Sequence, residues 1–146
     1  MNHNNLNPEV WGPHYWFMLH TIAINYPLNP TKEIKKKYYD FINNLNIFIP
    51  NESIGNKFKK ILDKYPVSPY LDSKESIMKW MHFIHNKINR ILNKDEITYQ
   101  ESLERYYKNY IPKEFIIEER NNSKKHLMYS LIFIILIGGG YILYNK

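Results

Sequence analysis

The stretch WGPHYWFMLHTIAINYP, residues 11–27, decides how this chain folds. Trp16, His20 and Ala23 follow one another at spacings of four and three, which places them on one face of an α-helix. Prolines close the stretch, and a proline within a helix interior removes a hydrogen bond and clashes with the preceding turn. The sequence therefore predicts a first helix over residues 8–26.

The remaining sequence has the same helical period, without a sustained alternation of apolar and polar residues. Proline-containing segments separate the apolar stripes and mark the turns between helices. Thr31 is a candidate N-cap for the second helix, because its hydroxyl can accept a hydrogen bond from a free backbone N–H. The predicted fold is all-α, a compact bundle of four or five helices. The predicted helices cover residues 8–26, 31–48, 53–65, 73–93 and 100–109.

Composition limits the functions open to the chain. Its 146 residues suffice for one small domain and a tail, and aromatic residues make up 16% of them. The absence of cysteine excludes a disulfide framework, a thiolate metal site and thiol chemistry by these residues. The formal net charge is +6, but no nucleic-acid recognition motif accompanies it. We therefore expect no nucleic-acid partner.

The two ends of the chain suggest a membrane protein. Residues 1–5 lack the basic and apolar regions of a signal peptide, so the N-terminal domain is expected in the cytosol. Residues 127–144 are uncharged and are about as long as the shortest membrane-spanning helix, and basic residues precede them. The expected organisation is a domain over residues 1–110, a polar spacer over 111–126 and a transmembrane helix over 127–144. This describes a single-pass membrane protein with a C-terminal anchor.

Polar side chains follow one face of the predicted helix 73–93. His82, His85, Asn86 and Asn89 stand at positions i, i+3, i+4 and i+7. A buried polar group without a partner costs about 1–3 kcal/mol, so a ligand or the protein itself would have to satisfy this face. A solvent-exposed helix face explains the pattern equally well. No metal site is expected, because the two histidines are three residues apart and no suitably placed acid follows.

His20 alone is typical of a histidine satisfied within a core. Together with Trp16 and Tyr26, however, it forms an aromatic wall that suits a flat heterocycle.

Two motifs together resemble a known family. The stretch at residues 11–27 is similar to the first motif of the Erv/ALR family of FAD-linked sulfhydryl oxidases, which contains Trp-Gly, a second Trp, Leu-His-Thr and Tyr-Pro. The stretch WMHFIHNKINRILNK at residues 80–94 is similar to the second motif, a Trp followed by His-Asn-x-Val-Asn and Leu-x-Lys. The match covers residues 8–110. The compact form, and the Ile-Thr-Tyr segment after Lys94, most resemble the oxidases of large cytoplasmic DNA viruses.

The resemblance implies a function and a set of binding residues. Family members form disulfide bonds in proteins and pass the electrons through FAD to oxygen, usually as homodimers with FAD inside a helical bundle. Lys94 would lie near phosphate, and Gly12 would allow close approach at the start of the first helix. The residues implied in FAD binding are Gly12, Trp16, His20, Tyr26, His85, Asn86, Ile88, Asn89 and Lys94.

The chain departs from the family where the chemistry is performed. The family has a Cys-x-x-Cys pair after a proline at the end of the second helix, whereas Pro50 is followed here by Asn51 and Ile54. Neither side chain ionises or forms a disulfide, so we assign no catalytic residue. The favoured interpretation is a membrane-anchored, redox-inactive or altered family member that retains either FAD binding or only the dimeric scaffold. The alternatives are a non-catalytic dimeric scaffold that binds a protein partner at a membrane, and an active oxidase whose cysteines have been removed.

Overall fold

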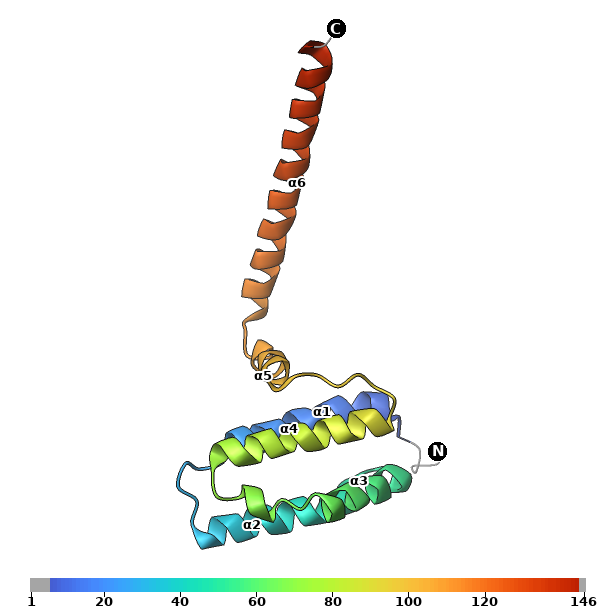
Figure 1. The fold of residues 1–146 in the computed structure, drawn as a ribbon, viewed down its shortest axis with the longest axis vertical. Helices are drawn as coiled ribbons and strands as arrows, with labels where there is room; N and C mark the ends of the chain where they lie inside the picture. The colour runs from blue at the N-terminus through green and yellow to red at the C-terminus, as the bar shows by residue number, and fades with distance from the viewer. Residues whose placement is uncertain (1–5, 145–146) are drawn as a thin grey trace. The chain divides into compact units, whose positions relative to one another are not determined.

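The computed structural model describes residues 6–144, and regular structure within that range is helical throughout. The prediction of an all-α fold is therefore confirmed. The short 3-10 helices η1 and η2 lie in the connections on either side of α3 (Figure 1). The elements are α1 (Pro8–Ile24), α2 (Lys32–Asn44), η1 (Leu45–Phe48), α3 (Glu52–Lys64), η2 (Ser68–Tyr70), α4 (Lys74–Ile91), α5 (Tyr99–Lys108) and α6 (Lys113–Tyr144).

The ends of the first five α-helices lie close to the predicted positions. The predicted N-cap is confirmed, because the Thr31 hydroxyl accepts a hydrogen bond from the Ile34 N–H at 3.3 Å. Only the second helix differs from its predicted form. Its α-helical part ends at Asn44, and the remaining predicted residues form the 3-10 helix η1. Such a tighter turn is common at helix ends, where backbone carbonyls lack intrahelical partners.

The chain divides into two compact units, the first ending at Tyr106 and the second beginning at Tyr107. In the first unit α1 and α4 lie side by side, and α2 and α3 form the layer opposite them (Figure 1). Ion pairing of Glu9 with Lys94 and contact of His20 with His85 show that α1 and α4 are antiparallel. The core contains the largest fully buried side chains, which are Tyr26, Ile42, Leu62, Ile77, Met81, Ile84 and Val67.

Aromatic side chains fix the connections to the helices. The Trp80 indole N–H of α4 donates to the Tyr65 carbonyl at the end of α3, at 3.1 Å. The Tyr15 hydroxyl of α1 donates to the Phe48 carbonyl of η1 at 2.8 Å. These bonds satisfy backbone carbonyls that the helix ends leave free and set the register of the layers.

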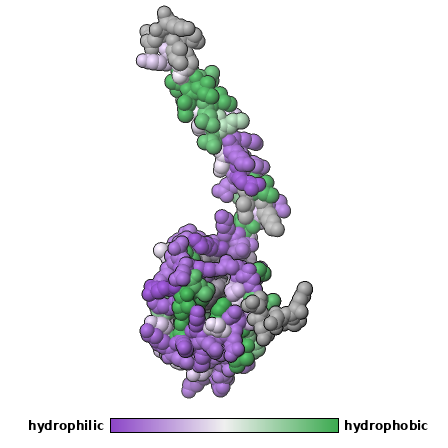
Figure 2. Space-filling model, turned by 90° about the vertical axis from the view of Figure 1, so that its right-hand side faces the viewer, coloured by the Kyte–Doolittle hydropathy of each residue, from purple (hydrophilic) through white to green (hydrophobic). Residues whose placement is uncertain are grey.

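The structure corrects the expected membrane anchor. Residues 113–144 form one helix, α6, whose sequence is rich in charged residues in the first half and mainly apolar in the second. Figure 2 shows the change from hydrophilic to hydrophobic residues along the coloured part of this helix. A membrane-spanning helix needs about 20 predominantly apolar residues. Among the residues that the structure describes, no helix is long and apolar enough to span a bilayer, so the predicted single-pass C-terminal anchor is wrong.

Within the expected polar spacer at 111–126, residues 113–126 form the first half of this same helix. The segment 1–5, on which the expectation about a signal peptide rested, lies outside the described residues.

Candidate functional site

Three aromatic side chains meet where α1 crosses the middle of α4. Trp16 and His85 stack with their ring centroids 3.9 Å apart and their planes 8° from parallel. His20, one turn after Trp16, places its Nε2 atom 3.0 Å from Nδ1 of His85. Trp16 and His20, two of the three residues expected to form an aromatic wall, thus lie beside His85 of the second motif.

Burial keeps the two bonded imidazoles neutral near pH 7. Desolvation, followed by the nearby charge of His82, lowers the pKa of His20 from 6.5 to about 4. Desolvation also lowers the pKa of His85 to about 3, with smaller contributions from neighbouring His and Lys residues. Because both rings are neutral, one can donate and the other accept in their shared hydrogen bond. The cluster is a neutral, planar surface that suits an aromatic ring better than an anion.

The polar side chains on one face of α4 have two different roles. Asn86 makes a reciprocal pair with the backbone of Ile97, donating from Nδ2 to the carbonyl at 2.8 Å and accepting the N–H at 3.3 Å. Its amide therefore holds the segment after α4. His82 contacts Asn86 through Nε2, but its buried Nδ1 finds no hydrogen-bond partner in the described chain. An orphaned buried nitrogen is costly, so His82 marks a place where a polar ligand atom would be favourable.

The end of α4 positions the remaining residues of the second motif. Ile88 is buried in the core. The Asn89 carbonyl accepts hydrogen bonds from the N–H groups of Leu92 and Lys94, which turns the chain out of the helix. Lys94 then pairs with Glu9 at the start of α1, with 2.9 Å between Nζ and Oε1. A cation thus lies at the end of the α1–α4 pair, although a carboxylate already faces it.

Two residues of the first motif lie in different surroundings. Gly12 has open space beside it, because a Cβ atom placed there would meet no atom within 4 Å. Tyr26 is only 1% exposed, and its hydroxyl donates to the Leu71 carbonyl at 2.7 Å. Its ring packs edge-on against Tyr38. The structure therefore places Tyr26 in the core, away from the stacked cluster that it was expected to join.

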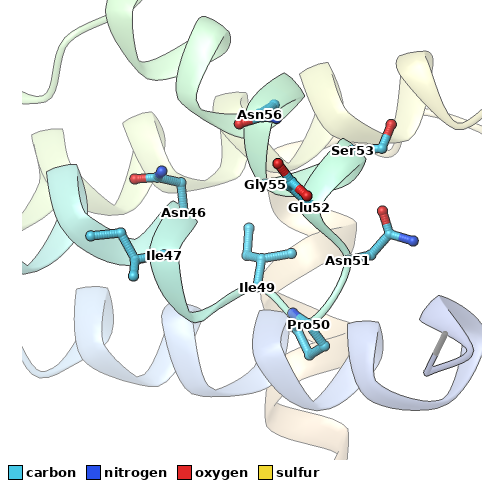
Figure 3. A pocket seen from close by; sticks show the side chains of 9 residues that line it. All are labelled: Asn46, Ile47, Ile49, Pro50, Asn51, Glu52, Ser53, Gly55 and Asn56. Carbon is cyan, nitrogen blue, oxygen red and sulfur yellow. The ribbon is translucent and has the colours of Figure 1, made fainter. Parts of the chain in front are cut away.

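The positions expected for a cysteine pair form the start of α3. The Asn51 Oδ1 accepts the Ile54 N–H at 3.0 Å and caps the helix, while Ile54 is half-buried. Close packing follows at Gly55, where a Cβ atom would lie 2.8 Å from the Asn46 carbonyl oxygen. An open hollow of about 530 Å³ lies around this turn, and Figure 3 shows the side chains that line it. Its lining residues are Asn46, Ile47, Ile49, Pro50, Asn51, Glu52, Ser53, Gly55 and Asn56.

Some residues of the site region are absent from the set implied by the resemblance. His82 is one, although its helical spacing to His85 was a visible signal. Glu9 and Ile97 are others, and the sequence held no signal for them, because their partners lie on distant segments. Tyr106 is a further case: its hydroxyl lies 2.9 Å from the Thr21 hydroxyl, which anchors α5 on α1.

Comparison with known proteins identifies the family to which this chain belongs. The fold and site define a helical bundle with a neutral aromatic cluster between its first and fourth helices. A family model described as Erv1 / Alr family matches residues 13–108. This chain belongs to the Erv1/Alr family.

The matches to individual relatives cover different shares of those relatives' lengths. A protein of Acanthamoeba polyphaga mimivirus named "Probable FAD-linked sulfhydryl oxidase" is 37% identical over 74% of this chain and 76% of its own. The FAD-linked sulfhydryl oxidase ERV1 of Arabidopsis thaliana is 34% identical over 59% of this chain, but only 44% of its own. The chain therefore spans less than half of this plant relative. The crystal structure of the yeast Erv1 core has a TM-score of 0.62 and 26% identity, covering 73% of this chain and 86% of that one.

Proposed function

We propose that this chain binds FAD between α1 and α4 but does not itself exchange thiols for disulfides. One observation supports the absence of thiol exchange. The Asn51 side chain caps α3 by accepting the Ile54 N–H, and these two residues stand at the positions that the family resemblance aligns with cysteines. The chain would then be a flavin-binding domain that is disconnected from dithiol substrates.

The residues present fit a flavin dinucleotide. Trp16, His20 and His85 would hold a flat ring, because they form a neutral aromatic surface. The unpaired Nδ1 of His82 offers a polar contact to a heterocycle. Lys94 would face the phosphates, provided that it exchanges Glu9 for them. Bound FAD would supply a two-electron acceptor, and the relatives are named FAD-linked sulfhydryl oxidases.

The start of α3 lacks the groups that would deliver electrons. Thiol oxidation needs a thiolate that attacks sulfur and a second sulfur that completes the disulfide. Asn51 offers an amide, and its oxygen is engaged by the helix end. Ile54 offers a hydrocarbon, and the 146 residues contain no cysteine. A dithiol substrate therefore has no exchange partner within this chain.

The absorption spectrum of the purified full chain tests flavin binding. We expect a flavin band, with FAD released in about equimolar amount on denaturation, and oxygen uptake with dithiothreitol no faster than with free FAD. A colourless, folded protein that does not take up added FAD would contradict the binding proposal and favour a scaffold role. Oxygen uptake above the free-FAD rate would contradict the proposed disconnection.

Restoring a cysteine pair tests the disconnection directly. The double variant Asn51→Cys/Ile54→Cys should gain dithiol oxidation, because a thiol at a helix N-terminus has a lowered pKa and exchanges readily. A matched control, Ser53→Cys/Asn56→Cys, has the same spacing at the same hollow but is displaced by two residues. We expect no gain in the control. Equal gains in both variants, or none in the first despite bound FAD, would contradict the assignment of these positions.

The family resemblance further implies that two copies associate. We propose a homodimer as the form in solution, and sedimentation equilibrium of the full chain would detect it. A monomer at every concentration tested would refute this part of the proposal.

A further inference from the structure

A cluster of aromatic and cationic side chains lies where the end of α3 meets α4. Tyr65 and Phe83 pack edge to face, with their ring centroids 5.0 Å apart. The Lys64 ammonium lies over the Tyr65 ring at 5.4 Å. The Lys87 ammonium lies 5.8 Å from the Tyr65 ring and 4.7 Å from the Phe83 ring. We call these four residues the basic corner.

The main chain holds the basic corner in place. Tyr65 is the C-cap of α3, and its N–H donates to the Ile61 carbonyl at 2.8 Å. Its carbonyl accepts the Trp80 indole N–H at 3.1 Å, which ties the end of α3 to α4. Phe83 and Lys87 are one turn apart on α4, so their side chains are neighbours on that helix. The backbone of the corner therefore belongs to two helices and the end of one of them, which are tied together, and not to a free loop.

The basic corner is not neutralised by carboxylates of the described residues. Several other cations of the first unit do form ion pairs, including Lys35 with Asp72 and Lys59 with Asp63. Within residues 6–144, neither corner lysine lies within 4 Å of a carboxylate. Glu96 is near enough to Lys87 to feel its charge, but it is paired with Arg90.

The positive charge continues along α3. Lys57 and Lys60 precede Lys64 by seven and four residues, which places all three on one stripe of the helix. Both are exposed and, among the described residues, form no ion pair. Cation–π contacts offset the repulsion between ammonium groups at the corner but leave its net charge unchanged. An anionic partner would therefore be attracted to the corner and to this stripe.

We propose that the basic corner docks an acidic segment of another polypeptide, with carboxylates against Lys64 and Lys87 and further carboxylates along α3. Single-stranded nucleic acid fits less well, because its binding relies on bases stacked on open aromatic faces. Here the ammonium groups lie over the rings, and the rings meet edge to face. A carboxylate can reach either ammonium without moving a ring. This proposal does not depend on flavin binding.

Binding of a labelled acidic peptide to the full chain tests the proposal. The probe is a fluorescein-labelled peptide of alternating glutamate and serine, followed by fluorescence anisotropy. Lys64→Gln/Lys87→Gln should weaken binding by about tenfold, as truncation of close charge pairs does at interfaces. The matched control Lys32→Gln/Lys37→Gln removes the same charge from exposed positions on α2 and should weaken binding by less than about twofold. Lys64→Arg/Lys87→Arg should retain binding.

Several results would overturn the proposal. Absence of peptide binding at low salt would do so, and so would equal weakening by both glutamine pairs, which would indicate a general effect of net charge. Tighter binding of single-stranded oligothymidylate, lost in the same corner variant, would assign the surface to nucleic acid instead. If the corner double variant loses its helical circular dichroism, Lys64→Gln alone provides the test, because Lys64 is exposed. It should weaken binding at least about threefold, and no change would refute the proposal.

Flavin content separates this proposal from the proposed function. It should be the same in the corner variants as in the unaltered chain, because the corner is not part of the Trp16–His85 cluster.

Discussion

The Asn51 side-chain oxygen accepts the backbone N–H of Ile54 at 3.0 Å, so the two positions aligned with a cysteine pair are joined by a helix cap. The free N–H groups of a helix start favour negative charge, and they would lower the pKa of a thiol placed there. In this chain a neutral amide satisfies one of them. The same local geometry thus stabilises α3 without providing a nucleophile.

Removal of this cap should destabilise the protein. Asn51→Ala is expected to lower the free energy of unfolding by about 1 kcal/mol, whereas Asn51→Asp should preserve it, because both Asn and Asp are good N-caps. Urea unfolding followed by circular dichroism measures the difference. Ser53→Ala, at an exposed position in the first turn, is the control and should change stability little. An unchanged midpoint in Asn51→Ala would show that the cap contributes nothing.

Stability should decrease in mild acid because of the histidine pair. The folded-state pKa values of His20 and His85 are about 4 and about 3, below the ordinary value of 6.5. Between pH 6.5 and these folded-state pKa values, the unfolded chain binds more protons than the folded chain. The free energy of unfolding therefore falls as the pH falls. Above pH 6.5 the pair adds no pH dependence. The expected loss approaches about 1.4 kcal/mol per pH unit for each histidine.

Urea unfolding between pH 6.5 and about 5 checks this prediction, because most carboxylates remain ionised in that window. The double variant His20→Gln/His85→Gln should show a smaller slope of stability against pH, whatever its absolute stability. His14→Gln, at an exposed position on α1, is the control and should retain the original slope. The same slope in all three proteins would mean that the pair titrates normally.

Tyr26 should matter for stability but not for flavin binding. Tyr26→Phe removes the hydroxyl that donates to the buried Leu71 carbonyl and leaves that carbonyl unpaired. The expected loss is about 1–3 kcal/mol. Tyr39→Phe, on the exposed side of α2, should cost much less. The flavin absorbance of folded Tyr26→Phe should match that of the unaltered chain, and a selective loss of flavin would return Tyr26 to the ligand site.

The two helical glycines of the first unit should respond in opposite directions to alanine. Gly55→Ala forces a Cβ to 2.8 Å from the Asn46 carbonyl oxygen, and overpacking of this kind costs about 1–3 kcal/mol. Gly12→Ala meets no atom and should gain about 0.5–1 kcal/mol from lower backbone entropy in the unfolded chain.

Thermal unfolding of both glycine variants measures the contrast. Reduced flavin content in the stabilised Gly12→Ala variant would support close approach of the cofactor at this position. A similar loss of stability in both variants would contradict the difference in packing.

Local patterns were enough to predict the helices and the family. The period of apolar residues and the positions of proline determined where α1 to α5 begin and end, because helix formation and termination depend on neighbouring residues. The membrane prediction is the part that the structure does not support, because no helix among the described residues is long and apolar enough to cross a bilayer.

By itself, the sequence determined that this chain is a helical member of the Erv1/Alr family and that it contains no thiol. Only the tertiary structure decided how its polar residues are used. Asn86 is engaged by Ile97, Tyr26 by Leu71, and His20 by His85. The physical reason is that a buried polar group takes whichever partner the fold brings within about 3 Å, and residues far apart in sequence become such partners only after the helices have packed.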